Sequence, residues 1–455
     1  MNTNRRNLIK GLGAFGVLAS TGSLASPFSI LKNLSNSPND KIRFATIGMG
    51  IQGNYDTKAA LANEGVEFVA AADLYTGRLE RVKEVYGKNI FTTRDYREIL
   101  QRKDIDAVII ATPDHWHDTI TIHALEAGKH VYCEKPMVHD IEKGYPVIEA
   151  WRKSGKTMQV GSQRISGSVF NEAKRLVTAG EIGEINYIES NSDRFNAIGA
   201  WNYTIPTDAS TQTVDWDTFL KNTHKIPFDA KRFFRWRNYR DYGTGVAGDL
   251  FVHLITGVHF ITNSKGPNRI FASGNLSYWK DGRDVPDVMV SIMDYPKTNE
   301  HASFQMVLRV NFANAGNINN NTRIIGTEGQ IDLSGEGLVL SKKKLPKAPG
   351  MRGYDSYDTF SAAQQKELDK QYDALYSEAD RKTDPVKEIK FMPPAGENEH
   401  RNHFKNFFDH VRAGTQNTIE DPLFGFRAAA PVLACNESYF SNKPFIWDPV
   451  NLKKG

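Results

Sequence analysis

The sequence predicts an α/β protein with an N-terminal doubly wound parallel sheet, followed by a second domain with an open antiparallel sheet. Three observations predict this. The chain has 455 residues, which is long enough for two domain cores. Apolar strands alternate with helix-compatible segments from residue 41 to about residue 134, as in a parallel sheet. Later strands alternate apolar and polar side chains, as in a sheet with one buried face.

The composition is that of an ordinary soluble protein, with 40% hydrophobic and 24% charged residues. A formal charge of +4 without a basic stripe argues against a nucleic-acid partner. The two cysteines, Cys133 and Cys435, lie too far apart in the chain to favour a disulfide. No apolar run of about eighteen residues follows the N-terminus, so we expect no stable membrane insertion once a signal is removed.

Residues 1–39 are predicted to be an export signal and a linker. Arg5 and Arg6 precede, after a short spacer, a weakly apolar run from Gly11 to Leu24. This pattern resembles a twin-arginine signal, and a small-x-small cleavage site ends at Ala25. A plain secretory signal or a membrane anchor is the alternative. We therefore expect a periplasmic or exported protein.

The first strand, in KIRFATIGMGIQGNY, runs into the pattern Gly48-x-Gly50-x-x-Gly53 ahead of a helix-compatible run, which is the context of a dinucleotide-binding turn. Glycines permit the tight turn and let backbone N–H groups approach a pyrophosphate at a helix N-terminus. Residues 40–162 are therefore predicted to form an NAD-binding Rossmann domain.

Asp73 ends the second strand, VEFVAAAD, twenty residues after the last glycine of the turn. A carboxylate at this place binds both ribose hydroxyls and repels a 2′-phosphate, so NAD is favoured over NADP. Arg78 follows closely and keeps NADP as the lesser alternative.

The segment ATPDHWHDTITIHALEAGKHVYCEKP resembles the diagnostic block of the glucose–fructose oxidoreductase, inositol dehydrogenase and rhizopine-catabolism family, written Gfo/Idh/MocA. The Glu-Lys-Pro triplet after a Gly-Lys-His strand is specific to it, and VGSQR and GDLFVH continue the resemblance. It extends from about Lys41 to the C-terminus, less clearly between residues 341 and 399. It implies that residues 163–455 form an α/β domain with a large, mostly antiparallel sheet, which binds substrate and often forms a subunit interface. A homo-oligomer is therefore expected.

The resemblance implies three catalytic residues. Lys135 matches the family lysine near the nicotinamide and the substrate hydroxyl, where an ammonium can stabilise an alkoxide or act as a base. Asp249 and His253 match an Asp-x-x-x-His pattern on a helix, four residues apart and so on one face. There the carboxylate can orient the imidazole, which takes the hydroxyl proton as hydride leaves.

The cofactor contacts expected from the glycine turn and the resemblance also include the loop around Trp116. His-x-His in this loop suggests zinc, but the sequence offers no evident third ligand, so no metal site is predicted. Glu134 is expected to pair with Lys135 or to hold the backbone. The predicted cofactor-binding residues are Gly48, Gly50, Ile51, Gln52, Asp73, Thr112, Pro113, His115, His117, Glu134, Lys135 and Arg164.

The stretch RFFRWRNYRDYGTG combines aromatic rings with planar hydrogen-bonding groups, which suit sugar rings. The predicted substrate residues are Arg164, Trp236, Arg237, Asn238 and Tyr239, although a core-and-surface segment is an equal alternative for any one of them. Residues 341–396 are polar and are predicted to be a surface insertion, and helices near Phe404 and Phe426 are predicted to cover the second sheet.

These features favour an NAD(P)-dependent oxidoreductase that transfers hydride between a sugar, glycoside or cyclitol hydroxyl and a tightly bound nicotinamide. The alternative is a redox-neutral glycoside hydrolase or lyase that oxidises the ring transiently, eliminates and re-reduces. A non-catalytic binding protein ranks last, because Lys135, Asp249 and His253 are all present. A twin-arginine route carries folded proteins, so a bound cofactor can travel inside. The scarcity of free NAD outside the cytoplasm favours internal recycling.

Overall fold

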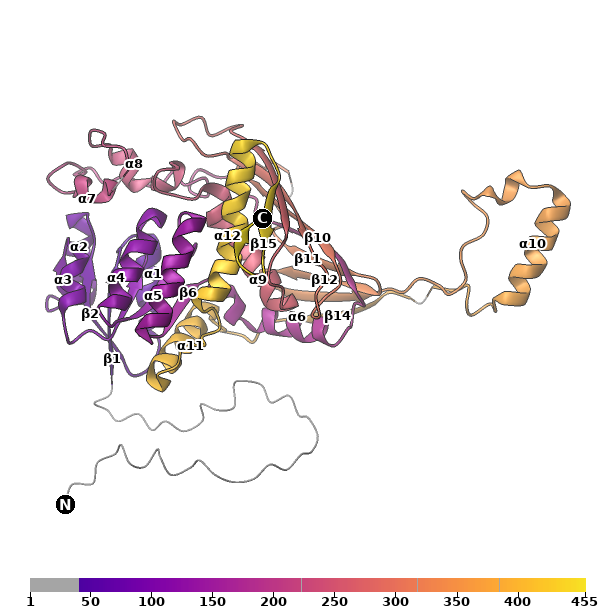
Figure 1. The fold of residues 1–455 in the computed structure, drawn as a ribbon, viewed down its shortest axis with the longest axis horizontal. Coiled ribbons are helices and arrows are strands. Elements are labelled where there is room, and N and C mark those ends of the chain that lie inside the picture. The colour runs from indigo at the N-terminus through magenta and orange to yellow at the C-terminus, as the bar shows by residue number, and fades with distance from the viewer. Residues whose placement is uncertain (1–40, 222, 317, 384) are drawn as a thin grey trace, which may run out of the picture. The chain divides into compact units, whose positions relative to one another are not determined.

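The computed structural model describes residues 41–221, 223–316, 318–383 and 385–455. The predicted export signal and linker, residues 1–39, lie outside the described residues. Both expected sheets are present, one of six strands and one of ten (Figure 1). Among the described residues, none of the helices has the length and apolar character needed to cross a bilayer.

The first sheet is entirely parallel, with the strand order β3-β2-β1-β4-β5-β6, so the predicted Rossmann architecture is confirmed. Its strands are nearly continuous apolar runs, because helices cover both faces. The strands are β1 (Ile42–Ile47), β2 (Val66–Ala72), β3 (Phe91–Thr93), β4 (Ala107–Ile110), β5 (His130–Glu134) and β6 (Met158–Gly161). The helices between them are α1 (Ile51–Leu61), α2 (Thr76–Tyr86), α3 (Tyr96–Gln101), α4 (His117–Glu126) and α5 (Gly144–Ser154).

A helix from the far end of the chain completes this domain. We expected the helices near Phe404 and Phe426 to cover the second sheet. Instead, α11 (Glu399–Ala413) packs against the first sheet, where Phe404 stacks on Tyr132 at 4.1 Å between ring centroids. The next helix, α12 (Pro422–Ser441), contacts both sheets. The first domain is therefore not a continuous stretch of sequence.

The second sheet has the order β14-β13-β12-β11-β7-β10-β9-β8-β15-β16, and only β7 and β10 pair in parallel. In β10 the residues Phe304, Met306, Leu308 and Val310 are buried and alternate with more exposed ones, as predicted. The helices α6 (Ser168–Thr178), α9 (Val252–Thr262) and α12 supply neighbours for the buried face. The strands are β7 (Ile185–Asn191), β8 (Arg269–Asn275), β9 (Val288–Tyr295), β10 (Phe304–Asn311), β11 (Thr322–Gly326), β12 (Gly329–Ser334), β13 (Gly337–Lys342), β14 (Lys387–Phe391), β15 (Phe445–Asp448) and β16 (Lys453–Lys454).

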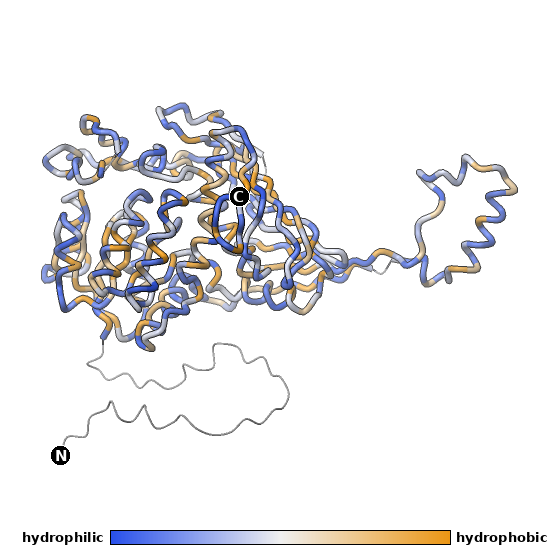
Figure 2. The backbone as a smooth tube through the Cα atoms, in the orientation of Figure 1, coloured by the Kyte–Doolittle hydropathy of each residue, from blue (hydrophilic) through white to orange (hydrophobic). Residues whose placement is uncertain are grey.

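The polar insertion is shorter than the predicted 341–396, because its ends pair as strands β13 and β14 of the second sheet. Between them lie a short 3₁₀ turn, η8 (Ser356–Thr359), and α10 (Ala362–Leu375). No residue of α10 is buried, and the segment is mostly hydrophilic (Figure 2). The hydrophobic residues concentrate instead in the two sheets and the helices that pack on them (Figure 2).

Residues 201–245, which we call the cover segment, lie against the carboxyl end of the first sheet. The segment contains α7 (Trp216–Leu220), α8 (Ala230–Phe234) and the 3₁₀ turn η6 (Trp236–Asn238). Tyr75, just after β2, bridges to Val214 of the segment. A cluster of aromatic residues, including Tyr75, Phe219 and Phe234, joins the two. This packing places the segment over the edge where Rossmann domains bind nucleotides.

Candidate functional site

The glycine turn between β1 and α1 has the shape that a dinucleotide pyrophosphate needs. Gly48 has φ +93°, and a Cβ there would lie 2.6 Å from the carbonyl oxygen of Ala111. A Cβ on Gly53 would lie 1.8 Å from the carbonyl oxygen of Gly48, so the third glycine packs the helix against the turn. Gly50 is the N-cap of α1 and offers no capping side chain. The first N–H groups of the helix are therefore left for an anionic ligand.

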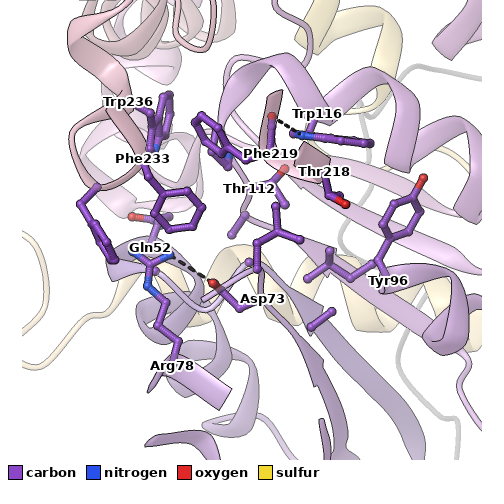
Figure 3. Close-up of a pocket in the computed structure, with 18 of the residues that line it drawn as sticks. Gln52, Asp73, Arg78, Tyr96, Thr112, Trp116, Thr218, Phe219, Phe233 and Trp236 are labelled. Carbon is purple, nitrogen blue, oxygen red and sulfur yellow. Dashed lines mark hydrogen bonds and ion pairs between the residues drawn. The ribbon is translucent and has the colours of Figure 1, made fainter. Parts of the chain in front are cut away.

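Asp73 is buried where β2 ends, and the local backbone holds its carboxylate. Its Oδ2 accepts a hydrogen bond from the backbone N–H of Met49 at 2.7 Å, and its Oδ1 accepts one from the backbone N–H of Tyr75 at 2.9 Å. Arg78 Nη1 lies 3.3 Å from both oxygens (Figure 3). Asp73, the acid predicted to bind ribose, thus lies at the end of β2 and pairs with the Arg78 guanidinium.

The glycine turn and Asp73 line one pocket together with the cover segment (Figure 3). Phe219, Phe233 and Trp236 of that segment face Gln52 and Asp73 across it. Seven of the predicted cofactor residues line this pocket: Gly48, Gly50, Ile51, Gln52, Asp73, Thr112 and Pro113. The others, His115, His117, Glu134, Lys135 and Arg164, are outside its lining.

The two histidines of the His-x-His loop are buried and engage backbone carbonyls. His115 Nε2 lies 2.8 Å from the carbonyl oxygen of Phe219, so it joins the cover segment to the first domain. His117 bridges the carbonyls of Pro136 and Thr112 at 2.8 and 3.0 Å. Burial lowers the pKa of both imidazoles, that of His115 to about 3. The expected direct cofactor contact is replaced by a positioning role, since these rings hold the residues around the pocket.

Lys135 and Asp249 meet in a buried ion pair that also includes Arg237. Lys135 Nζ lies 2.8 Å from Asp249 Oδ1 and 3.0 Å from the Asp249 carbonyl oxygen. Arg237 Nε lies 3.2 Å from the same carboxylate oxygen. The Lys135 and Asp249 side chains are each 10% exposed. Burial alone would raise the pKa of the Asp249 carboxyl, but Lys135 and Arg237 hold it well below its usual range.

His253 lies in the first turn of α9, but Asp249 lies in a π-helical turn before it, η7 (Ala247–Phe251). The turn lacks room for a side chain at Gly248, where a Cβ would come within 2.0 Å of Thr244 Oγ1. The expected Asp249–His253 contact is wrong, because the carboxylate pairs with two full positive charges instead. His253 Nδ1 is buried without a hydrogen-bond partner among the described residues.

The pKa of His253 lies well below its usual value, first because of burial and then because of the charges of Lys135 and Arg164. Its imidazole is therefore neutral near neutral pH, and a neutral imidazole can accept a proton.

The predicted substrate residues divide into three groups. Trp236 and Arg237 line the cofactor pocket. Asn238 and Tyr239 are buried and lie outside the lining of that pocket, and Tyr239 belongs to the aromatic cluster of the cover segment. Arg164 lines a different cavity of about 740 Å³, which we call the sheet cavity. That cavity is also lined by Leu254 of α9.

The structure adds a buried carboxyl cluster that the sequence does not indicate. Asp56 Oδ1 lies 2.7 Å from His400 Nε2, and Gln52 Nε2 donates to both Asp56 and Glu134. Gln163 Nε2 also donates to Glu134. One donor atom from each of Asp56, Glu134 and His400 lies within 4.8 Å of the others. The amide N–H groups of Gln52 and Gln163 point at the carboxylate oxygens, which a metal cation would need as ligands. The arrangement therefore fits hydrogen-bonded carboxyl groups better than a metal site.

Burial raises the pKa of Asp56 and of Glu134 to about 8 each. Asp56 and His400 are 344 positions apart in the chain, and only the packing of α11 on α1 brings them together. No local signal in the sequence could have revealed this cluster.

The family model described as "Oxidoreductase family, NAD-binding Rossmann fold" matches residues 42–162, and the model described as "GFO/IDH/MocA C-terminal domain" matches residues 219–332. The chain therefore belongs to the Gfo/Idh/MocA oxidoreductase family, and its first domain is an NAD-binding Rossmann domain.

Curated relatives include both dehydrogenases and a glycosidase group. The chain is 34% identical over 148 residues to scyllo-inositol 2-dehydrogenase (NAD(+)) of Bacillus subtilis, covering 32% of this chain and 43% of the relative. It is 34% identical over 146 residues to inositol 2-dehydrogenase of Salmonella typhimurium, covering 31% and 43%. It is 28% identical over 210 residues to a glycosyl hydrolase family 109 protein of Shewanella baltica, covering 42% and 46%. The matches thus span less than half the length of these relatives.

Solved structures share the fold over nearly the whole described chain. Levoglucosan dehydrogenase in complex with NADH and levoglucosan aligns with a TM-score of 0.62 at 18% identity, covering 89% of this chain and 98% of that one. An oxidoreductase of Thermotoga maritima aligns with a TM-score of 0.63 at 21% identity, covering 91% and 100%.

The carboxyl cluster makes stability depend on pH. A carboxyl group whose pKa is raised to about 8 on folding stabilises the folded state at low pH, and this contribution is lost as the pH rises from the unfolded pKa to about 8. Asp56→Asn removes one titrating group, so its Tm relative to wild type should increase between pH 5 and pH 8. Thermal unfolding over this range measures the difference. The exposed control Glu388→Gln should track wild type, and parallel Asp56→Asn and wild-type curves would refute the raised pKa.

Substitutions of Asp73 and of Arg78 are expected to shift the preference between NAD and NADP in opposite directions. Asp73→Ala should weaken NAD binding about tenfold or more, the size of a lost charge-assisted hydrogen bond, and improve NADP relative to NAD. Arg78→Ala leaves the carboxylate without its cation and should shift preference further toward NAD. Titration of cofactor-free protein with each dinucleotide measures both. An unchanged preference in Asp73→Ala would remove this residue from the ribose site.

Proposed function

We propose that the protein oxidises a hydroxyl group of a sugar, glycoside or cyclitol, with a nicotinamide cofactor held in the Rossmann pocket. The observation that carries this proposal is the position of the Lys135–Asp249–Arg237 group. Arg237 of this group lines the cofactor pocket, and its Nε lies 3.2 Å from the Asp249 carboxylate. The charged group therefore reaches the wall of the pocket that would hold the cofactor.

NAD, when bound, supplies the acceptor for hydride from the substrate carbon. The glycine turn and the N-terminus of α1 would hold its pyrophosphate, and Asp73 its adenosine ribose. The cover segment would exclude water from it, because aromatic side chains close the pocket opposite the turn.

Lys135 and His253 have different roles toward the substrate hydroxyl. Two oxygen atoms of Asp249 accept bonds from Lys135 Nζ, and an ammonium has three N–H groups. One donor is thus left for the substrate oxygen, where positive charge stabilises the developing alkoxide. His253 is neutral, so its imidazole can accept the hydroxyl proton.

Redox-neutral cleavage of a glycoside is the second candidate. It is supported by the similarity to glycosyl hydrolase family 109 proteins and by the enclosure of the cofactor pocket by the cover segment. In this route oxidation of a ring hydroxyl would give a transient carbonyl that acidifies the neighbouring C–H bond, and a base would remove that proton as the glycosidic oxygen leaves with a proton. Water would then add across the new double bond, and return of the hydride from the reduced cofactor would restore the hydroxyl. We further propose that the protein is exported, since Arg5 and Arg6 begin a twin-arginine pattern. Scarce external NAD would then favour a cycle that restores its own cofactor.

Substitution of the two reacting side chains tests the assignment. Lys135→Ala and His253→Ala should each lower turnover by about 10²–10⁴-fold, the usual range for acid–base catalysis. Both variants should retain NAD, because neither side chain lines the cofactor pocket. Turnover is measured on protein from the periplasmic fraction, and the cofactor is identified after denaturation.

The control is Lys153→Ala, which removes an exposed lysine of α5 that pairs with Glu149. It should match wild type in turnover and cofactor content. Loss of the cofactor or of folding in the two active-site variants would mean that Lys135 and His253 are structural. Protein confined to the cytoplasm would refute export alone.

A further inference from the structure

We propose that the side-chain carbonyl oxygen of Gln52 binds a hydrogen-bond donor in the nicotinamide half of the cofactor, and that Asp56 is a positioning residue which, together with Glu134, fixes the Gln52 amide for this contact. The inference rests on the proposed function and deepens it, because it assigns one atom of the pocket wall to one kind of group on the cofactor. It follows from the hydrogen bonds of a single amide and from the order of the strands.

Gln52 connects the cofactor pocket to the buried carboxyl cluster. It is the second residue of α1, and its side chain lines the pocket opposite aromatic side chains of the cover segment (Figure 3). Asp56 and Glu134 are buried and do not belong to that lining. The Gln52 side chain therefore contacts the carboxyl groups and also borders the space for the cofactor.

The carboxyl groups use both N–H groups of the Gln52 amide. Its Nε2 donates to Asp56 Oδ1 at 3.0 Å and to Glu134 Oε1 at 3.2 Å. An amide nitrogen carries two N–H groups, so no donor remains for a ligand. Gln52 Oε1 accepts no hydrogen bond from any residue in the described parts of the chain. The side chain therefore offers a ligand an acceptor and no donor.

The opposite orientation of this amide is unfavourable. Glu134 Oε1 also accepts a hydrogen bond from Gln163 Nε2, so this oxygen acts as an acceptor. Asp56 lies one helical turn after Gln52, and its Oδ1 is 2.7 Å from His400 Nε2, which holds the carboxyl group in place. A rotated Gln52 amide would set its carbonyl oxygen against the acceptor oxygen of Glu134 and lose both hydrogen bonds.

The strand order places this contact away from the adenosine end of the pocket. Asp73, which would hold the adenosine ribose, follows β2, whereas Glu134 ends β5, and β1 and β4 lie between these two strands. A dinucleotide lies across the carboxyl ends of the strands with its diphosphate at the glycine turn. Lys135 follows Glu134 directly and pairs with Asp249. Gln52 therefore contacts the side of the sheet on which the reacting groups lie.

The chemistry of the free atom identifies the group that it binds. Diphosphate oxygens are hydrogen-bond acceptors near neutral pH, so they do not match a free carbonyl oxygen. The hydroxyl groups of the second ribose and the N–H groups of the nicotinamide carboxamide are donors, and both match it. Either contact would orient the half of the cofactor that accepts hydride. Gln52 would thus act on the nicotinamide half, while the glycine turn and Asp73 hold the rest.

Calorimetric titration of cofactor-free protein with ADP, ADP-ribose and NAD tests the contact. Gln52→Leu should weaken NAD binding about three- to tenfold, the effect of one lost hydrogen bond. It should leave ADP binding unchanged, because ADP lacks the second ribose and the nicotinamide. An equal loss for ADP-ribose would identify a ribose hydroxyl as the donor, and a loss confined to NAD would identify the carboxamide.

Substitution of Asp56 tests the positioning role. Asp56→Asn keeps an acceptor oxygen beside Gln52 and should bind NAD like wild type, whereas Asp56→Leu should weaken NAD binding and spare ADP. Because Asp56 acts through Gln52, adding Asp56→Leu to Gln52→Leu should cause no further loss of NAD affinity. The matched control is Gln101→Leu, which replaces an exposed glutamine at the end of α3 and should match wild type with all three ligands.

Unchanged NAD affinity in Gln52→Leu would overturn the proposal. An equal loss of ADP and NAD affinity would also overturn it, because the substitution would then act on the shape of the glycine turn. Additive losses in the double variant would overturn the positioning role of Asp56. These measurements use no substrate, so they are independent of the proposed function, whose failure would appear as normal NAD binding without oxidation of any sugar or cyclitol.

Discussion

The buried carboxylate of Asp249 is the constraint on which the site depends. A charge this deeply buried is stable only when opposite charges and hydrogen bonds surround it. Lys135 comes from the turn after β5, Arg237 from the cover segment and Asp249 from the π-turn before α9. Three parts of the chain must therefore be correctly placed together, and the pair of charges ties the cofactor domain to the sheet domain at the reacting centre.

The ion pairs of Asp249 with Lys135 and Arg237 also affect the protonation state of His253. Because Asp249 is committed to Lys135 and Arg237, it is not available to orient His253, whose ring stays neutral among several positive charges. A neutral imidazole is in the protonation state that can accept a proton. The cover segment forms one wall of the cofactor pocket, and Arg237 connects that wall to the Asp249 carboxylate.

Local sequence patterns were sufficient to predict the elements whose conformation depends on residues close together in the chain. The glycine turn, Asp73 at the end of β2 and the alternation in β10 all have short-range causes, and the structure places them as predicted. The failures share a long-range cause. The packing of α11 on the first sheet, the Asp56–His400 contact and the burial of Tyr239 depend on segments distant in the chain. The expectation that Asp249 and His253, four residues apart, meet on one helix face also failed, because a π-turn replaces the regular helix at Asp249.

The central claim is that hydride passes between a ring carbon of the substrate and the nicotinamide beside Lys135 and His253. A substrate deuterated at the reacting carbon tests this most directly. After one turnover of the NAD-loaded protein, mass spectrometry of the released cofactor should find deuterium on the nicotinamide ring, or deuterium returned to the product in a redox-neutral cycle with a slowed rate. Cleavage or oxidation of the labelled sugar with no isotope effect and no deuterium on the cofactor would contradict the account.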